Sequence, residues 1–312
     1  MRPRLIAIDW GSTRFRSWLL DPKGTEIDSI DEEFGILNIN DKQYIKVFEQ
    51  LLGSWIKEYK AIPIIASGMI GSRQGWIEAP YLECPSGTEH LARNLAYLKI
   101  KSNIINETLS MAIVPGIKLF QNGVPDVMRG EETQVSGLVW NKIKFGLCIF
   151  PGTHSKWVIL NEGLIENFTT FMTGEIFSLI ANRSIINKSM VGTSFKKDEF
   201  ELGCKQSFNS SYGFLKEVFS ARTMELFEKI EPRGIHSYLS GLILGNEIKN
   251  GINIYHKNCN KNDEKIILNG KNSLCNLYKI AFEIAGIKVK LEKKNLVAQG
   301  LFQIAKIGFL NK

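Results

Sequence analysis

The stretch LCIFPGTHSKWVIL at residues 147–160 repeats the pattern of LIAIDWGSTRFRSWLL at residues 5–20. In both stretches an apolar run meets a short turn that contains a glycine, and a second run follows. This order of strand, tight polar turn and strand is typical of a β-hairpin. The alignment pairs the turn residues in order: Gly152 with Gly11, Thr153 with Ser12, and His154 with Thr13.

The two copies differ at the residue near the end of the first strand. Asp9 falls opposite Phe150, so the copies share a backbone pattern but not a chemistry. Two such hairpins, one opening each half of the chain, predict a duplicated fold with a ligand between the halves. A chance match of two short hairpins is the alternative, and the turn residues alone leave it open.

The segments that follow the hairpins alternate between helix and strand patterns. Residues 41–59 carry apolar side chains three and four positions apart, which predicts an amphipathic helix, and residues 62–66 read as a buried strand. This alternation favours an α/β fold. Further helices are predicted at residues 175–186, 214–230, 236–248, 273–285 and 296–309, with Gly300 at a close-packing point. The Lys- and Asn-rich residues 250–264 predict an exposed connection.

The length and composition indicate a globular protein with two lobes. The chain has 312 residues, 44% hydrophobic and 23% charged, which excludes global disorder, and a single core is near its practical limit at this length. We predict one domain over residues 1–140, with the first hairpin, and a second over residues 141–312, with the second hairpin. The net charge of +7 fits a lysine-rich solvated surface or the attraction of anionic ligands. Scattered Lys and Arg make nucleic acid a poor third option.

The cysteines and the N-terminus narrow the class of protein further. The five cysteines are odd in number and widely spaced, so neither a zinc site nor a disulfide framework is expected. The N-terminus has too short an apolar run for a signal peptide, and no run approaches the ~20 apolar residues of a spanning helix. We therefore expect a cytoplasmic protein without a membrane partner, with reduced thiols.

The first turn has the residue types that bind phosphate. Gly11 lets the backbone approach an oxyanion, while Ser12 and Thr13 add hydroxyl donors. Asp9 could hold Mg²⁺ beside the phosphate, directly or through water. The simpler interpretation is that Asp9 only caps the turn.

The second turn offers a similar cradle without the acid. Gly152 and Thr153 supply backbone and hydroxyl groups, and Lys156 supplies a charge. His154 could donate to a phosphate, or its ring could be satisfied by the backbone. The chain has no convincing hydrolase triad and no GxxxxGK[ST] loop, which excludes a P-loop enzyme.

The segment VMRGEETQ at residues 127–134 carries two acids at the predicted start of a helix. Glu131 and Glu132 could be there because carboxylates stabilise the helix dipole. Alternatively, one of them is a general base for a sugar hydroxyl. The residue types alone leave both interpretations open.

Taken together, the separated motifs resemble those of the 2-dehydro-3-deoxygalactonokinases, sugar-acid kinases of the actin- and hexokinase-like superfamily. The resemblance covers most of the chain and rests on five segments: IAIDWGSTRFRSWL at 6–19, ASGMIGSRQGWIEAPYLECP at 66–85, VMRGEETQVSG at 127–137, FPGTHSKWV at 150–158, and FMTGE at 171–175. It implies two ribonuclease-H-like lobes around an ATP cleft. It also implies transfer of the γ-phosphate of ATP, with Mg²⁺, to the 6-hydroxyl of 2-dehydro-3-deoxy-D-galactonate in galactonate catabolism.

The resemblance also implies roles for individual residues. Asp9 would organise Mg²⁺ as its metal ligand, and Glu132, with Glu131 close behind, would be the catalytic base. The ATP and phosphate contacts would be Gly11, Ser12, Thr13, Gly152, Thr153, His154, Lys156 and, for the adenosine side, Gly270. The sugar-acid contacts would be Ser72, Arg73, Gln74, Trp76 and Arg129. Arg73 offers a bidentate partner for the substrate carboxylate, although it could equally be a surface arginine beside a buried tryptophan.

Three other functions compete with this one. The chain could phosphorylate a different 2-keto-3-deoxy sugar acid, because substrates that differ only at C4 are not distinguished by the sequence. It could be an exopolyphosphatase-like phosphohydrolase, which the sugar-binding block at residues 68–76 disfavours. A sugar-sensing regulator would carry a DNA-binding motif before the first hairpin, where only four residues precede Leu5. For the oligomeric state, a homodimer is the default expectation.

Overall fold

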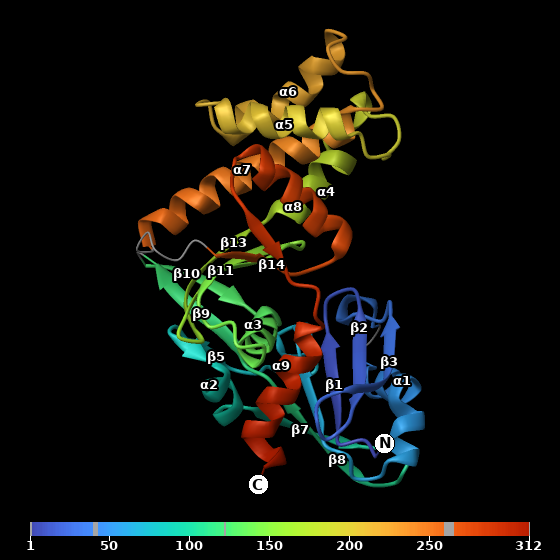
Figure 1. Ribbon diagram of the computed structural model, residues 1–312. Coiled ribbons are helices and arrows are strands. Elements are labelled where there is room, and N and C mark those ends of the chain that lie inside the picture. The colour runs from blue at the N-terminus through green and yellow to red at the C-terminus, as the bar shows by residue number, and fades with distance from the viewer. Residues whose placement is uncertain (1, 40–42, 122, 259–264, 312) are drawn as a thin grey trace. The chain divides into compact units, whose positions relative to one another are not determined.

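The computed structural model describes residues 2–39, 43–121, 123–258 and 265–311 (Figure 1). Its internal contacts divide the chain into two compact units. The first unit comprises Met1–Phe145, Leu160–Asn167 and Lys294–Lys312, and the second comprises Gly146–Ile159 and Phe168–Lys293. The C-terminal segment therefore returns to the unit that holds the N-terminus.

The first unit is built on a six-stranded sheet in the order β3-β2-β1-β4-β8-β7. Strand β1 runs antiparallel to β2 and parallel to β4, which is parallel to β8. The strands are β1 (Leu5–Trp10), β2 (Phe15–Leu20), β3 (Glu26–Glu32), β4 (Ile64–Ser67), β7 (Ala96–Lys101) and β8 (Thr108–Ile113). Because β1 and β4 are parallel neighbours, their carboxyl ends meet at one edge of the sheet.

Helix α1 (Tyr44–Glu58) covers one face of this sheet through an aromatic cluster. The Trp10 ring meets Phe15 edge to face with ring centroids 4.8 Å apart, and Tyr44 stacks on Trp76 at 5.7 Å. Aromatic side chains bury large apolar areas and prefer such geometries. The predicted helix at 41–59 and strand at 62–66 are confirmed, with slightly different bounds.

A smaller sheet in the order β10-β9-β5, the short strand β6 and three helices complete the first unit. These elements are β5 (Tyr81–Glu83), β6 (Ser86–Gly87), β9 (Gly116–Gln121), β10 (Val124–Met128), α2 (Thr88–Arg93), α3 (Glu131–Trp140) and α9 (Leu296–Ala305). Helices α3 and α9 pack closely, as Figure 1 shows, because a Cβ atom on Gly300 would lie 1.8 Å from the Thr133 carbonyl oxygen. The predicted close-packing role of Gly300 is confirmed.

The sheet of the second unit has the order β15-β14-β11-β12-β13-β6, and its last strand, β6, pairs with the residues of β13 that belong to the first unit. Its strands are β11 (Gly146–Phe150), β12 (Ser155–Asn161), β13 (Leu164–Phe171), β14 (Ile266–Leu268) and β15 (Val289–Leu291). Strand β11 is parallel to β14, and β14 is parallel to β15. Read from β13 to β14, the strands are the third, second, first and fourth of this unit in chain order, as β3, β2, β1 and β4 are in the first unit. A further parallel strand follows at the same place in each sheet, β15 here and β8 there. The predicted duplicated α/β fold is confirmed.

Five helices surround this second sheet or pack beyond it. They are α4 (Thr173–Arg183), α5 (Lys197–Asn209), α6 (Phe214–Leu226), α7 (Ile235–Asn258) and α8 (Asn272–Ile284). Helices α5 and α7 lie side by side (Figure 1) at glycines, since a Cβ on Gly241 would lie 2.0 Å from the Phe200 carbonyl oxygen. Such an approach is open only to residues without a side chain.

The expectation of an exposed connection at 250–264 is wrong for its first part. Helix α7 continues to Asn258, because Tyr255 is buried and Ile252 packs against the core of this unit. Asn250, Asn253 and Lys257, which suggested a loop, occupy exposed positions of the helix. Residues 259–264 lie outside the described part of the chain.

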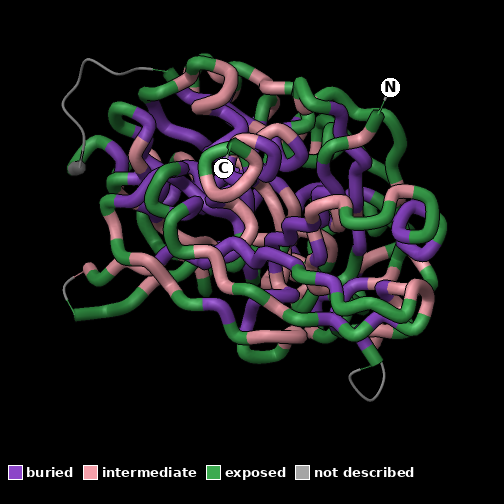
Figure 2. The backbone as a smooth tube through the Cα atoms, turned by 90° about the horizontal axis from the view of Figure 1, so that it is seen from below, coloured by how far each residue is buried: buried purple, intermediate pink, exposed green. Residues whose placement is uncertain are grey.

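Burial follows the sheets and the inner faces of the helices. Figure 2 shows buried backbone (purple) toward the inside and exposed backbone (green) along the outer turns. Within the described residues, no helix is long and apolar enough to span a bilayer.

Candidate functional site

The first turn is held on its carbonyl side by the segment that follows β3. The Gly11 amide donates to the Arg14 carbonyl at 2.9 Å, which closes the turn. The carbonyl oxygens of Gly11 and Ser12 then accept from Ile36 and Leu37, both at 3.0 Å. A Cβ atom on Gly11 would meet only the Arg14 carbonyl oxygen, at 3.5 Å, so this glycine leaves space above the turn.

Asp9 lies at the carboxyl end of β1, and its side chain is largely buried with 13% exposed. It accepts a hydrogen bond from Arg16, its cross-strand partner on β2. On the other side, Asp9 is in register with Ser67 of β4. The Ser67 hydroxyl is buried and has no hydrogen-bond partner among the described residues. A buried polar atom of this kind requires a partner, and a bound ligand or water can supply one.

Two glycines bring the start of helix α3 to Asp9. Gly68 has a φ of 90° and Gly130 has a φ of 118°, conformations that a residue with a Cβ rarely adopts. A Cβ on Gly68 would lie 3.0 Å from an Asp9 carboxylate oxygen, and a Cβ on Gly130 would lie 3.6 Å from the Gly68 Cα. The carboxyl ends of β1 and β4 and the N-terminus of α3 therefore meet in one place.

The first turn of α3 carries both predicted acids. Glu132 is fully buried, and its two carboxylate oxygens accept from the Gly130 amide at 2.8 and 2.7 Å. Burial, reinforced by the neighbouring charge of Glu131, raises the pKa of Glu132 to about 8. Glu131 is half-buried. A carboxyl group with a pKa near neutrality can exchange a proton at physiological pH.

The predicted sugar-acid block at residues 72–76 is part core and part surface. Ser72 is buried and donates to the Met69 carbonyl at 2.7 Å. Arg73 and Gln74 are exposed, and Trp76 lies half-buried against Tyr44. Arg129, at the end of β10, is buried. The positions of residues 72–76 follow from the tight turn at Gly75, where a Cβ atom would lie 2.2 Å from the Ile70 carbonyl oxygen.

The second turn is held in the same way by the start of helix α4. The Glu175 amide donates to the Thr153 carbonyl at 3.1 Å, and a Cβ on Gly174 would lie 2.5 Å from the Gly152 carbonyl oxygen. Nothing lies within 4 Å of the Cβ position of Gly152. The second glycine, like the first, faces open space.

Charged side chains flank this second turn. The exposed His154 ring pairs with the Glu175 carboxylate. Lys156 is buried, and its ammonium group donates to the Thr170 hydroxyl at 2.9 Å. A lysine that is almost fully buried is rare unless it is paired, so this cation beside the turn is suited to an anionic ligand.

The adenosine-side glycine lies next to the second turn. Strand β14 is parallel to β11, and the Asn269 amide donates to the Ile149 carbonyl at 3.1 Å. A Cβ on Gly270 would lie 3.3 Å from the Pro151 carbonyl oxygen. The structure thus brings Gly270 together with Gly152, Thr153, His154 and Lys156 in the second unit.

Beneath the second turn is a buried acid that the sequence analysis missed. Glu247 of α7 accepts from the Trp157 indole at 2.7 Å and from the Tyr278 hydroxyl at 2.8 Å. The Tyr278 hydroxyl also bonds to Ser155 at 2.7 Å, and Thr173 contributes a further hydrogen bond to Glu247. Burial raises the pKa of Glu247. Its only sequence signal is an acid within an apolar helix.

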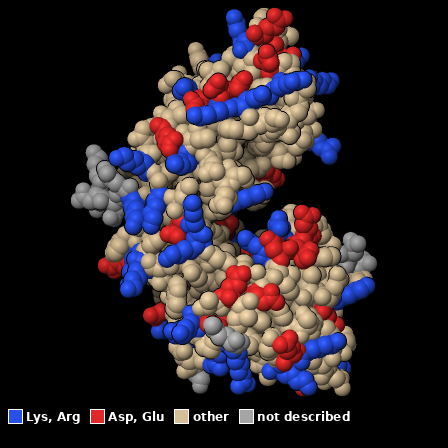
Figure 3. Space-filling view, turned by 45° about the vertical axis from the view of Figure 1, so that its right-hand side comes forward, with Lys and Arg blue, Asp and Glu red and all other residues tan. Residues whose placement is uncertain are grey.

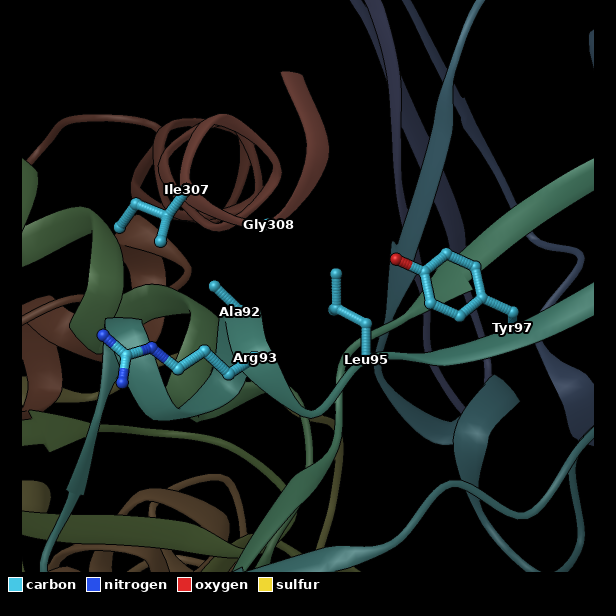
Figure 4. A pocket seen from close by; sticks show the side chains of 6 residues that line it. All are labelled: Ala92, Arg93, Leu95, Tyr97, Ile307 and Gly308. Carbon is cyan, nitrogen blue, oxygen red and sulfur yellow. The ribbon is translucent and has the colours of Figure 1, made fainter. Parts of the chain in front are cut away.

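The surface away from the two turns has features that do not coincide with the predicted site residues. A pocket of about 380 Å³ in the first unit is lined by Ala92, Arg93, Leu95, Tyr97, Ile307 and Gly308 (Figure 4). It contains none of the predicted site residues. Lys and Arg alternate with Asp and Glu over the face shown in Figure 3. Within the described ranges, no three His, Cys, Asp or Glu side chains gather as a metal site.

Comparisons with known proteins agree on one family. A sequence model described as 2-keto-3-deoxy-galactonokinase matches residues 9–304. The chain is 32% identical over 248 residues to the 2-dehydro-3-deoxygalactonokinase of Escherichia coli, with 80% of each chain covered. A Sinorhizobium meliloti protein, proposed to be a 2-dehydro-3-deoxygalactonokinase, has a crystal structure that is 28% identical. The two structures align with a TM-score of 0.84 over 98% of this chain and 99% of that one.

A more distant solved structure shares the fold alone. It is component A of the (R)-2-hydroxyglutaryl-CoA dehydratase of Acidaminococcus fermentans. The identity is 14% and the TM-score is 0.53, with 99% of each chain covered.

Proposed function

Because this chain belongs to the 2-keto-3-deoxy-galactonokinase family, we propose that its first unit carries the reacting groups of an ATP-dependent sugar-acid kinase. The fold is the duplicated α/β fold of actin- and hexokinase-like kinases. The enzyme is a phosphotransferase with an alcohol group as acceptor. It transfers the γ-phosphate of ATP to the 6-hydroxyl of 2-dehydro-3-deoxy-D-galactonate, giving the 6-phosphate and ADP in galactonate catabolism.

One observation carries the assignment of the reacting groups. Gly68 and Gly130 meet, and through them the Asp9 carboxylate and the first turn of α3 lie at the same edge of the sheet. Phosphoryl transfer depends mainly on positioning and on charge stabilisation. A carboxylate next to a helix N-terminus with further acids provides a place for a metal ion and for a proton acceptor.

Glu132 is the proposed general base. In the reaction, the sugar O6 forms a bond to the γ-phosphorus while the bond from that phosphorus to the bridging oxygen breaks, and the hydroxyl proton passes to the carboxylate. A pKa of about 8, raised by burial, keeps the proton affinity of Glu132 near the working pH. Its carboxylate bonds to the Gly130 amide, so it must turn toward the hydroxyl when substrate is bound. Glu131 is the alternative base, because it is half-buried at the preceding position.

Asp9 is the proposed Mg²⁺ ligand. Mg²⁺ usually keeps several waters and binds one or two carboxylates together with substrate phosphates, so a single acid is sufficient. The neighbouring Ser67 hydroxyl, which has no hydrogen-bond partner in the described part of the chain, supports a polar ligand in this place. When bound, the ion would neutralise charge on the phosphates. Arg16 holds the Asp9 carboxylate in place, so the contact to Mg²⁺ through water suits this geometry.

The phosphate contacts are proposed for both turns. In the first turn the proposed contacts are Gly11, Ser12 and Thr13. In the second turn they are Gly152, Thr153, His154 and Lys156, with Gly270 on the adenosine side. The open Cβ positions of Gly11 and Gly152 support close approach of phosphate oxygens. Residues 1–140 would thus provide the sugar-acid side of the enzyme and residues 141–312 the adenosine side.

The sugar-acid contacts are proposed for the block at 72–76 and for Arg129. Ser72, Arg73, Gln74 and Trp76 lie on one tight turn after β4, which supports their acting together. A cytoplasmic location and a homodimer remain predictions of the sequence.

The direct test is a coupled kinase assay with ATP and a panel of 2-keto-3-deoxy sugar acids, with a control that lacks sugar. The galactonate-derived acid should give the highest kcat/KM. Phosphate release of equal rate without any sugar would instead indicate a phosphohydrolase.

The base is tested by Glu132→Gln with Glu131→Gln as its matched control. Glu132→Gln keeps the shape but cannot accept the proton, so kcat should fall about 10²–10⁴-fold with near-normal KM values. Neighbouring helical positions point about 100° apart, so Glu131→Gln should do much less. In the unmodified enzyme kcat should rise with pH through about 8, as the Glu132 carboxyl loses its proton, and Glu132→Gln should lack that rise. The opposite order of effects would make Glu131 the base.

A further inference from the structure

Arg129 is a buried cation held on three sides by the first unit. It is 8% exposed, and its guanidinium lies 4.2 Å from the centre of the Tyr81 ring. One terminal nitrogen, Nη2, donates to the Ala79 carbonyl at 2.8 Å, and Nε points to the Tyr81 hydroxyl at 3.4 Å. These contacts fix the plane of the guanidinium before any ligand arrives.

The other terminal nitrogen, Nη1, is buried and has no hydrogen-bond partner in the described chain. It faces Gly71, where a Cβ atom would lie 3.1 Å from it. Gly71 belongs to the tight turn that continues into Ser72 and Arg73. The glycine therefore keeps the free edge of the guanidinium clear on the side of the sugar-acid block.

The charge of Arg129 is also not neutralised. Its two contacts are to a carbonyl and a hydroxyl, and no ion pair with a carboxylate forms among the residues that the structure describes. Arg129 lowers the pKa of the nearby Glu132 carboxyl, but burial outweighs this effect and raises that pKa to about 8. A buried and unpaired cation is costly, and an anionic ligand would remove that cost.

We infer that Arg129, rather than Arg73, binds the C1 carboxylate of the sugar acid and makes the enzyme select acids over neutral sugars. This inference rests on the proposed function of the first unit. Arginine forms two parallel hydrogen bonds with a carboxylate, and a guanidinium that is already oriented loses little entropy in doing so. Arg73 is exposed, and its guanidinium lies at the end of a flexible side chain in water, where an ion pair contributes little free energy.

A phosphate of ATP is the other anion that could use the same nitrogen. The position favours the sugar acid, because Nη1 faces the turn at Gly71 and not the glycine-hydroxyl turn at residues 11–13. Loss of a sugar-acid contact would change kcat/KM for the acid, whereas loss of a phosphate contact would change the ATP KM, so one experiment distinguishes the two.

The experiment compares the acid with its neutral analogue, in which a hydroxymethyl group replaces the C1 carboxylate. Arg129→Gln and Arg129→Lys are measured beside Arg93→Gln, a change at an exposed arginine of the same unit, as the control. Arg129→Gln should lower kcat/KM for the acid about ten- to a hundredfold and leave that for the neutral analogue nearly unchanged. Arg129→Lys keeps the charge but not the paired donors, and should recover part of the loss. Arg93→Gln should change kcat/KM for neither substrate, and the ATP KM should stay constant in all three.

Equal losses on acid and neutral analogue would overturn the inference, because they indicate a structural role. A raised ATP KM with an unchanged preference for the acid would also overturn it and assign the anion to phosphate. If the wild-type enzyme phosphorylates none of the sugar acids, the proposed function fails, and calorimetric binding of the acid then decides about Arg129. Binding that Arg129→Gln abolishes supports the inference, and equal binding to both proteins contradicts it.

Discussion

The two glycine-hydroxyl turns share a backbone design and differ in the charges attached to it. Each turn joins the first two strands of its sheet, and each is braced by a segment that follows the third strand. Gly35 packs against the carbonyl oxygen of Ser12 as Gly174 packs against that of Gly152, with Cβ positions only 2.3 and 2.5 Å away. Each of the two turns is therefore held by a closely packed glycine from the segment that follows the third strand.

The difference lies beneath the turns. The first has Asp9 in contact with Arg16, whose side chain is 43% exposed. The second has the apolar Phe150 in place of the acid, and the buried network of Glu247 supports it from below. We therefore propose that the turns of both units bind phosphate, and that, among the residues the structure describes, the groups for metal and proton chemistry lie in the first unit.

The largest expected effect concerns Asp9. Asp9→Asn keeps the shape and a hydrogen bond to Arg16 but removes the charge that we propose for Mg²⁺. We expect kcat to fall about 10²–10³-fold, the usual cost of losing one stabilising group in an active site, together with a higher Mg²⁺ requirement. Metal titration of the steady-state rate measures both.

The matched change in the second turn is Phe150→Leu. A swap of similar volume in the core should cost less than about 1.5 kcal/mol of unfolding free energy and leave the Mg²⁺ dependence unchanged. If Asp9→Asn keeps normal metal titration, or if Phe150→Leu alters it, the two turns do not differ in the way described.

The next effect concerns how the turns are held. Glu247→Gln exchanges a buried acceptor of several hydrogen bonds for a group that also donates, and should lower the unfolding free energy by about 1–3 kcal/mol. Arg16→Gln removes a partly exposed ion pair and should cost only about 0–1 kcal/mol. Urea unfolding of both variants measures the difference. Equal losses would show that the first turn depends on its ion pair as much as the second does on its buried acid.

A smaller effect should be equal in the two units. Gly152→Ala adds a methyl group where nothing lies within 4 Å, and Gly11→Ala adds one at an ordinary contact distance, 3.5 Å, from the Arg14 carbonyl oxygen. Unfolding free energies should therefore stay within about 0.5 kcal/mol. The methyl group would occupy the space proposed for phosphate oxygens, and the ATP KM should rise about tenfold. Gly174→Ala is the control for strain, because its Cβ would collide with Gly152, and it should destabilise the fold by about 1–3 kcal/mol. An unchanged ATP KM in Gly152→Ala would contradict the proposed binding of phosphate by the second turn.

Local patterns were enough to predict the repeated hairpins and most helices, because strand alternation and helical spacing are written in neighbouring residues. The motif resemblance pointed to the residues that meet at Gly68 and Gly130. The sequence could not show that Glu132 bonds back to the Gly130 amide or that Arg129 is buried, because both depend on packing between segments far apart in the chain. Glu247 was missed for the same reason, since its donors come from distant segments.

The smallest effect is expected for His154, at the tip of the second turn. Its ring pairs with Glu175, but 48% of the His154 side chain is exposed, and ion pairs in such positions contribute about 0–1 kcal/mol. His154→Gln keeps a hydrogen-bonding side chain, so the ATP KM should change less than about threefold and the unfolding midpoint should hardly move. Thr13→Ala is the matched variant, because Thr13 occupies the aligned position in the first turn. Isothermal calorimetry with ATP and thermal unfolding measure both. If His154→Gln weakens ATP binding more than about tenfold while Thr13→Ala does not, the second turn binds phosphate through a side-chain charge, and its amides are no longer the common feature of the two turns.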